Sequence, residues 1–219
     1  MRLPLPQFTA RDRPAHHIAE VVETSTTEFL AQCFDAEELR FPPMPPFGSW
    51  VKAKEEEGGY WVYGVVYFAS TAPIDSVHRA RALGLSLDEL REQQPQVFAM
   101  LKTEFRAAIA GFQAASPHSS FAPGMMYQHL PPRPPQLHQA VFVCDVDEVM
   151  QFTEKLDFLR SLLQMTAVPV DALIAATLRE IYQLRRADRE WLVQAGRTLG
   201  ILLKDDYDRL RAILSQIYF

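Results

Sequence analysis

The segment from residue 60 to residue 69 constrains the fold more than any other part of the chain. It reads Tyr-Trp-Val-Tyr-Gly-Val-Val-Tyr-Phe-Ala, and aromatic or β-branched residues of this kind favour a strand. Residues 60, 62, 66 and 68 form one face of that strand, and residues 61, 63, 65, 67 and 69 form the other. Both faces are apolar, whereas a strand in a sheet covered on one side keeps a polar face towards water. We therefore expect this strand to be covered twice, by the interior of a barrel and by a layer packed outside it.

Three further patterns place other strands around this one. Residues 50–54 precede it across the turn Glu-Glu-Glu-Gly-Gly, which predicts a hairpin with a solvated acidic tip. Residues 18–22 and 28–34 flank a polar bend and predict a second hairpin. Residues 139–144 predict one more strand. Between the hairpins, residues 41–47 contain four prolines, which favour an extended and stiff connector.

Helical patterns occupy two other regions. Residues 86–89 form a capping box, Ser-Leu-Asp-Glu, that opens a helical insertion at about 75–112. The apolar residues that support this insertion keep helical spacing: Val97, Phe98, Leu101, Phe105 and Ile109. From Asp145 onward the same capping spacing is followed by four apolar-faced helices with short connections. The expected fold is therefore α+β, with a small antiparallel β-barrel carrying a helical insertion over 1–145 and an antiparallel α-helical bundle over 146–219.

The net charge and the two cysteines indicate which partners and which cellular compartment to expect. The net charge is −5 and no run of lysine or arginine occurs, so composition gives no reason to expect nucleic acid as a partner. Cys33 and Cys144 lie far apart and form no CxxC pair, which favours buried thiols in a reducing compartment. The N-terminus lacks the apolar stretch of a signal peptide, and no run approaches the roughly 20 apolar residues that span a bilayer. We expect a soluble cytoplasmic protein without membrane insertion.

No motif for nucleotide, metal or covalent chemistry is apparent in the sequence. None of the five lysines follows a glycine, so the GK step of a P-loop is missing. The pattern G-x-S-x-G of a serine hydrolase is also missing. His129 and His138 flank a proline-rich loop without acidic or cysteine neighbours at ligand spacing, which favours solvated histidines over a zinc site. We therefore expect no cofactor, no metal and no enzymatic activity.

Seven aromatic residues are the candidates for a protein-binding surface. Aromatic side chains with a polar handle are enriched at interface hot spots, although they also fill barrel cores, which is their commoner use. Two of the seven bracket the proline-rich connector and five lie on the hairpin that includes residues 60–69. The candidates are Phe41, Phe47, Trp50, Tyr60, Trp61, Tyr63 and Tyr67.

The N-terminal part resembles the HAS-barrel, the small β-barrel shared by HerA-type DNA-translocating ATPases and the F-type ATP synthase catalytic subunits. The likeness rests on residues 18–29, on the strand entry Gly48-Ser49-Trp50-Val51-Lys52, and on the strand Val62-Tyr63-Gly64-Val65-Val66. Residues 134–144 resemble the return of the chain that closes such barrels. The resemblance covers about the first third of the chain and that late strand.

This resemblance implies a role in assembly and partner docking, because the family uses the barrel in that way and the ATPase domain has no counterpart here. We therefore expect a protein-binding adaptor or assembly factor whose partner is another barrel-bearing protein or a membrane-associated complex. Two alternatives remain open. One is an enzyme with a site in the cleft between barrel and bundle, and the other is an accessory protein of nucleic-acid processing.

Overall fold

The computed structural model describes residues 14–34, 41, 43–74, 81–114, 124–166, 168–204 and 206–217. The strands within these ranges are β1 (His17–Thr24), β2 (Glu28–Cys33), β3 (Trp50–Glu55), β4 (Tyr60–Pro73), β5 (Leu101–Gln113), β6 (Met126–Tyr127) and β7 (Ala140–Val143). The helices are α1 (Leu87–Gln93), α2 (Gln96–Ala99), α3 (Val146–Phe152), α4 (Phe158–Leu163), α5 (Val170–Leu184), α6 (Arg189–Leu203) and α7 (Tyr207–Ser215).

Six strands form a closed antiparallel barrel in the order β2-β1-β7-β3-β4-β5, and a pairing between β5 and β2 completes the ring. The two predicted hairpins are confirmed as β1–β2 and β3–β4, and the late strand is confirmed as β7 between β1 and β3. The short strand β6 adds to β5 outside the ring. The expected α+β architecture, a barrel followed by helices, is also confirmed.

Part of the predicted helical insertion is wrong. Helices α1 and α2 lie within it, and the capping box of Ser86 and Glu89 is present. Residues 101–113, however, form β5, the strand that pairs with both β2 and β4. The spacing between Phe105 and Ile109 is compatible with a helix and equally with a strand, because a separation of four is also an even number. Pairing along both edges of β5 decides in favour of the strand.

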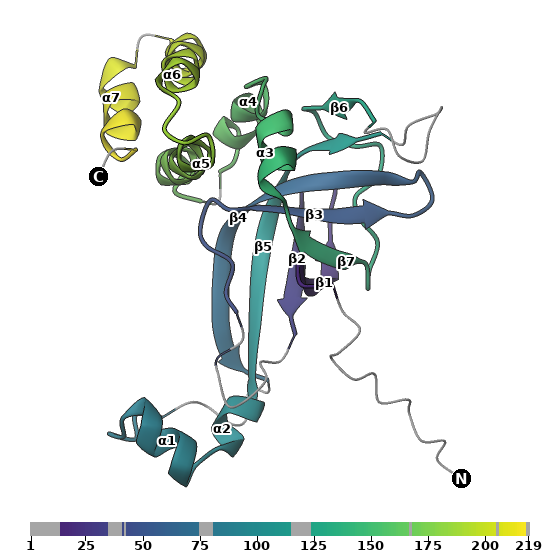
Figure 1. Ribbon diagram of the computed structural model, residues 1–219, viewed down its shortest axis with the longest axis vertical. Helices are drawn as coiled ribbons and strands as arrows, with labels where there is room; N and C mark the ends of the chain where they lie inside the picture. Colours follow the sequence, from purple (N-terminus) through teal and green to yellow (C-terminus); the bar gives the residue numbers. More distant parts are fainter. Residues whose placement is uncertain are drawn as a thin grey trace.

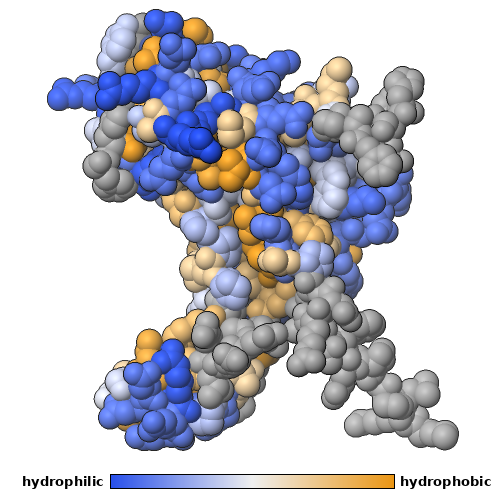
Figure 2. All heavy atoms as spheres, viewed as in Figure 1, coloured by the Kyte–Doolittle hydropathy of each residue, from blue (hydrophilic) through white to orange (hydrophobic). Residues whose placement is uncertain are grey.

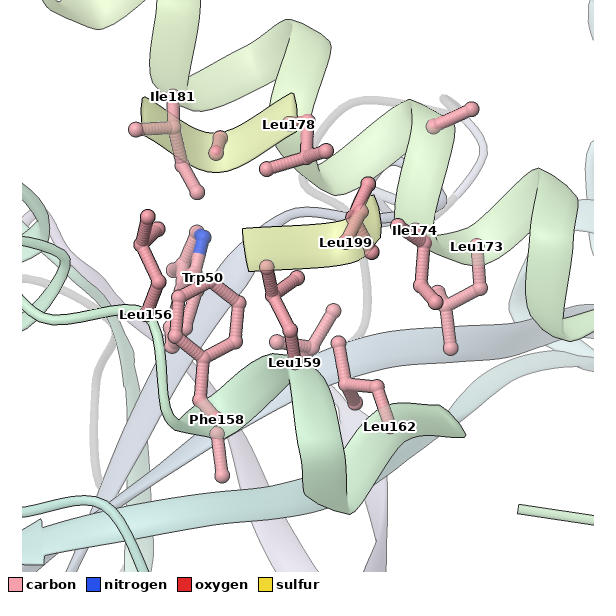
Figure 3. Close-up of a cluster of buried hydrophobic side chains, with 14 of the residues drawn as sticks. Trp50, Leu156, Phe158, Leu159, Leu162, Leu173, Ile174, Leu178, Ile181 and Leu199 are labelled. Atoms are coloured by element: carbon pink, nitrogen blue, oxygen red, sulfur yellow. The ribbon is translucent and has the colours of Figure 1, made fainter. Parts of the chain in front are cut away.

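Strand β4 is covered on both faces over its first half, as its sequence predicts. Tyr60, Val62 and Val66 belong to the cluster that fills the barrel. Tyr63 and Val65 belong to a second cluster, in which the outside of the barrel packs against the C-terminal helices. In this second cluster Trp50 lies beside Phe158 and beneath the side chains of α5 (Figure 3). The buried cluster therefore runs across the boundary expected at residue 145, where strands give way to helices.

Helix α5 is the element through which the helical region meets the barrel. It contacts α3, α4, α6 and α7, and the turn before β3 lies directly against it. Gly48 in this turn has a φ of +88°, and a Cβ on it would lie 2.8 Å from the backbone nitrogen of Thr177 and 2.9 Å from the Ala176 carbonyl carbon. Only glycine fits such a position without displacing the helix.

The tip of the β3–β4 hairpin is held against the proline-rich loop before β7. The Glu55 carboxylate is fully buried and accepts hydrogen bonds from the backbone N–H of Gly58 at 2.5 Å and from the amide of Gln136 at 3.1 Å. Arg133 lies 3.8 Å from the same carboxylate, and its backbone N–H donates to the hydroxyl of Tyr60 at 3.0 Å. The prediction of a solvated tip is thus wrong for Glu55, although Glu56 and Glu57 are exposed.

Substituting Gly48 tests the close approach between barrel and helix. We expect Gly48→Ala to lower the free energy of unfolding by about 2 kcal/mol or more, because the new methyl group meets the backbone of α5 at a strained φ. Gly196→Ala, inside α6, is the matched control, since a Cβ at this position would lie at an ordinary contact distance of 3.9 Å from Leu214 of α7. That change should stabilise the protein by about 0.5–1 kcal/mol through helix propensity. Urea unfolding of both variants measures the two effects, and equal shifts would contradict the packing argument.

A second substitution tests the buried carboxylate of the hairpin tip. We expect Glu55→Ala to cost about 2 kcal/mol, because it removes the buried acceptor of the Gly58 N–H and the Gln136 amide. Glu56→Ala, one residue along and exposed, should change stability by less than about 0.5 kcal/mol. Thermal unfolding followed by circular dichroism compares the two, and a small loss for Glu55→Ala would show that water replaces its carboxylate readily.

The half-buried Glu180 on α5 makes stability depend on pH. Burial raises the pKa of this carboxyl from 4.5 to about 7. Because the pKa of Glu180 is higher in the folded protein than in the unfolded chain, its carboxyl group stabilises the fold below pH 4.5. This stabilisation is lost as the pH rises through about 7.

We therefore expect the free energy of unfolding to fall by about 2–3 kcal/mol more between pH 5 and pH 8 with Glu180 present than with a neutral residue in its place. Glu180→Gln should remove this part of the pH dependence, and the exposed Glu190→Gln should leave it intact. Urea unfolding at a series of pH values measures the difference. Parallel pH profiles for the parent and Glu180→Gln would contradict the assignment.

Candidate functional site

Four of the seven predicted binding residues lie inside the protein. Trp50 and Tyr63 are almost fully buried, and their rings contact Phe152 at centroid distances of 5.2 and 5.0 Å. Tyr60 is buried in the barrel, and Tyr67 is 9% exposed. These side chains form the two cores, which leaves little of their surface for a partner.

The remaining three candidates reach the surface. Trp61 is partly buried, with the ammonium group of Lys52 5.0 Å above its ring. Phe41 and Phe47 are 45% and 42% exposed, and both lie on the proline-rich connector. The exposed candidates therefore point to the connector and not to the barrel hairpin.

The connector runs along a projection that we call the arm, formed by residues 67–73 of β4, residues 101–106 of β5 and the helices α1 and α2. Figure 1 shows β4 and β5 leaving the barrel as a two-stranded ribbon that ends at α1 and α2, away from the C-terminal helices. The Phe41 ring lies 5.3 Å from that of Phe98 in α2. At the other end, the Gly48 N–H donates to the Val66 carbonyl at 2.8 Å. Phe41 and Gly48 thus lie at opposite ends of the arm.

A β-bulge turns an aromatic side chain outward where the arm begins. The register of β4 with β5 shifts between Val66 and Phe68. As a result Phe68, which simple alternation groups with the barrel-filling Tyr60, Val62 and Val66, is 51% exposed, while Ala69 packs against the barrel cluster. A bulge of this kind re-aims side chains and cannot be predicted from alternation alone.

Exposed apolar side chains collect along the arm. Figure 2 shows apolar colours over the neck between barrel and tip, whereas hydrophilic colours dominate much of the upper region and the tip. We define the arm surface as the exposed large apolar residues of the connector and of residues 67–74, namely Phe41 (45% exposed), Met44 (48%), Phe47 (42%), Phe68 (51%) and Ile74 (57%). Sequence reasoning found the two phenylalanines of the connector but missed the other three, and the apolar Met44 between the prolines was the available signal.

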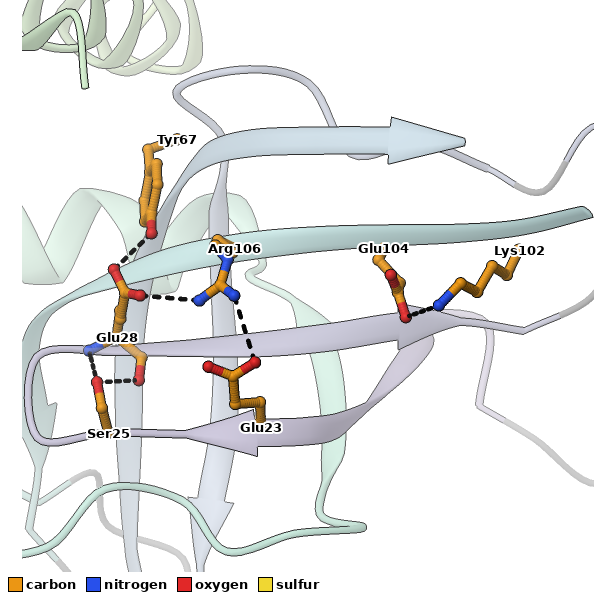
Figure 4. Close-up of polar contacts among 7 residues, drawn as sticks. All are labelled: Glu23, Ser25, Glu28, Tyr67, Lys102, Glu104 and Arg106. Atoms are coloured by element: carbon orange, nitrogen blue, oxygen red, sulfur yellow. Dashed lines mark hydrogen bonds and ion pairs between the residues drawn. The ribbon is translucent and has the colours of Figure 1, made fainter. Parts of the chain in front are cut away.

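A polar network braces the base of the arm against β1 and β2. The Glu28 carboxylate accepts a hydrogen bond from the Tyr67 hydroxyl and another from Arg106 at 2.9 Å, and Arg106 also donates to Glu23 at 3.3 Å (Figure 4). Burial and the hydrogen bond to Glu28 raise the pKa of Tyr67 to about 12. The phenol therefore keeps its proton and remains a donor.

A cavity of about 730 Å³ lies beside this network, between the barrel and α4. Glu28 and His129 are among its lining residues, together with the end of α4. His129 Nδ1 lies 3.0 Å from the Leu130 carbonyl oxygen, and its ring contacts Phe112 and Tyr127. This cavity is the described feature closest to the cleft considered in the sequence analysis.

The described residues contain neither a cluster of metal ligands nor a membrane-spanning helix. In these ranges, no three histidine, cysteine, aspartate or glutamate side chains gather where they could share a metal ion. No helix within the described ranges has the length and apolar character needed to cross a bilayer. Cys33 and Cys144 are free and buried, and burial raises the pKa of Cys33 to about 12, so neither thiol resembles an activated nucleophile.

Comparison with known proteins identifies the barrel. Residues 18–113 match the family model described as the HAS barrel domain. Among curated proteins, none matches the chain. The matched range holds β1 to β5, five of the six barrel strands, and the arm lies within it. The chain thus carries a HAS barrel domain over residues 18–113, which β7 completes as a closed antiparallel barrel.

Proposed function

We propose that this protein is a non-catalytic protein–protein interaction module, an adaptor or assembly factor of a larger complex. The observation that carries the proposal is the arm surface, an apolar group on an element that projects from the barrel. Isolated apolar residues are normal on protein surfaces, whereas several exposed apolar side chains on one projecting element favour a docking site. The HAS-barrel resemblance supports the same reading, since it implies partner docking.

The arm is built to present these side chains to a partner. The network around Glu28 fixes its base, and the hydroxyls of Thr71 and Thr103 lie 2.7 Å apart across its two strands. The connector beside β4 is rich in proline, which lacks the N–H needed to extend a β-ladder. Binding through side chains is therefore favoured over the addition of a partner strand at this edge.

The proposed partner is another barrel-bearing protein or a membrane-associated complex that meets the arm from the aqueous side. The proposed location is the cytoplasm, which the two free and buried cysteines support. Apolar side chains on the arm would supply most of the binding energy, with Phe41, Phe47 and Phe68 as aromatic anchors.

A double substitution on the arm tests this proposal. Phe68→Ser with Ile74→Ser removes two exposed apolar groups, so we expect a bound partner to be lost, with affinity falling at least about tenfold. Val193→Ser with Ile201→Ser is the matched control, because these residues are 52% and 77% exposed on α6. Tagged forms of each would be purified from the native host, and co-purifying proteins identified and quantified by mass spectrometry.

Support for the proposal is a defined partner recovered in stoichiometric amount with the parent and the α6 control but not with the arm variant. Recovery of the parent chain alone would contradict the adaptor function. Equal recovery with all three forms would place the docking surface elsewhere. Since all four residues are exposed, thermal unfolding should show near-parental stability for both variants.

A further inference from the structure

The cavity between the barrel and α4 has the dimensions of a small-molecule site. Its volume of about 730 Å³ lies within the roughly 300–1,000 Å³ typical of ligand sites. The floor is rigid, because β2 pairs with β5 there and the Ile109 N–H donates to the Thr27 carbonyl at 2.8 Å. The lining residues are Thr27, Glu28, Ala108, Ile109, His129, Leu130, Ser161, Leu162, Gln164, Met165 and Thr166.

Charge in the lining is negative. Glu28 is the only carboxylate among these residues, and the described lining includes no lysine or arginine. Its side chain is 30% exposed. Arg106 offsets this charge only in part, because the same guanidinium also pairs with Glu23, so the three side chains together keep one negative charge.

The Glu28 carboxylate is fixed in orientation and can accept further hydrogen bonds. One carboxylate oxygen accepts from Tyr67 and the other from Arg106, as the dashed lines in Figure 4 show. Each carboxylate oxygen can accept about two hydrogen bonds. The two donors therefore fix the orientation of the carboxylate and leave each oxygen able to accept one more.

Other polar groups in the lining are uncommitted. The side chains of Thr27, Ser161, Gln164 and Thr166 make no hydrogen bond to any residue in the described ranges. The lining also includes the apolar residues Leu130, Leu162 and Met165. A site for an amphipathic ligand typically combines apolar walls with a few polar groups that are free to form hydrogen bonds and one charged group.

We propose that this cavity binds a small organic amine, independently of any partner on the arm. The ammonium group would donate to the Glu28 carboxylate, and the apolar body would pack against the walls formed by Leu162 and Met165. An anion of the same shape would meet the Glu28 charge, and the described lining contains no lysine or arginine to compensate for it.

A matched set of probes tests the charge preference. The full chain, labelled with ¹⁵N, would be titrated with 2-phenylethylamine, with the neutral 2-phenylethanol and with the anionic 3-phenylpropionate. We expect saturable amide shifts confined to the cavity residues, with the amine bound at least about tenfold more tightly than the anion. Equal affinities for the three probes, no binding by the amine at millimolar concentration, or shifts spread over the surface would each overturn the proposal.

Two variants localise the binding. Glu28→Gln keeps the shape and removes the charge, so amine affinity should fall at least about tenfold, whereas Glu56→Gln at the exposed hairpin tip should leave it unchanged. Ser161→Phe fills the cavity from α4 without touching the Glu28 network, and it should abolish binding of the amine. Parental amine affinity in either cavity variant would overturn the proposed site. If Glu28→Gln fails to fold, the amine affinity of Ser161→Phe alone tests the proposal.

Discussion

The double burial of β4 is the constraint on which the rest of the structure depends. A strand with apolar side chains on both faces is stable only when each face is removed from water. The barrel interior satisfies one face, and the C-terminal helices satisfy the other through Trp50, Tyr63 and the aromatic side chains of α3 and α4. Barrel and helices are consequently parts of one packed unit, and the close contact of Gly48 with α5 follows from the same requirement.

Much of the fold could be predicted from the sequence because its signals are local. Alternation and turn residues indicated both hairpins, and capping boxes marked the starts of α1 and α3. Strand β5 could not be predicted in the same way, since its alanines and four-residue apolar spacing suit a helix until β2 and β4 pair with it. The burial of Glu55 was equally hidden, because its partners Gln136 and Arg133 come from a loop about 80 residues further along the chain.

In the candidate site, too, local sequence signals were predictive and features that depend on distant partners were not. Aromatic character alone could not separate core from surface, and four of the seven candidates lie in the two cores. Exposure at Phe68 arises from a register shift, which depends on the pairing partner and not on the strand's own residues. The connector was more predictable, since four prolines exclude it from the ladder and so keep its apolar residues near the surface.

The position of β7 has a consequence for how the chain acquires its structure during synthesis. The ring closes only when residues 140–143 insert between β1 and β3, and the outer face of β4 is covered only after α5 has been made. The matched range of residues 18–113 therefore lacks its closing strand and its outer layer. A ribosome would present the first 140 residues as an open sheet with unpaired edges, a state that exposes strand edges and apolar surface to aggregation. Chaperones that shield nascent chains would have their longest opportunity to act during this interval.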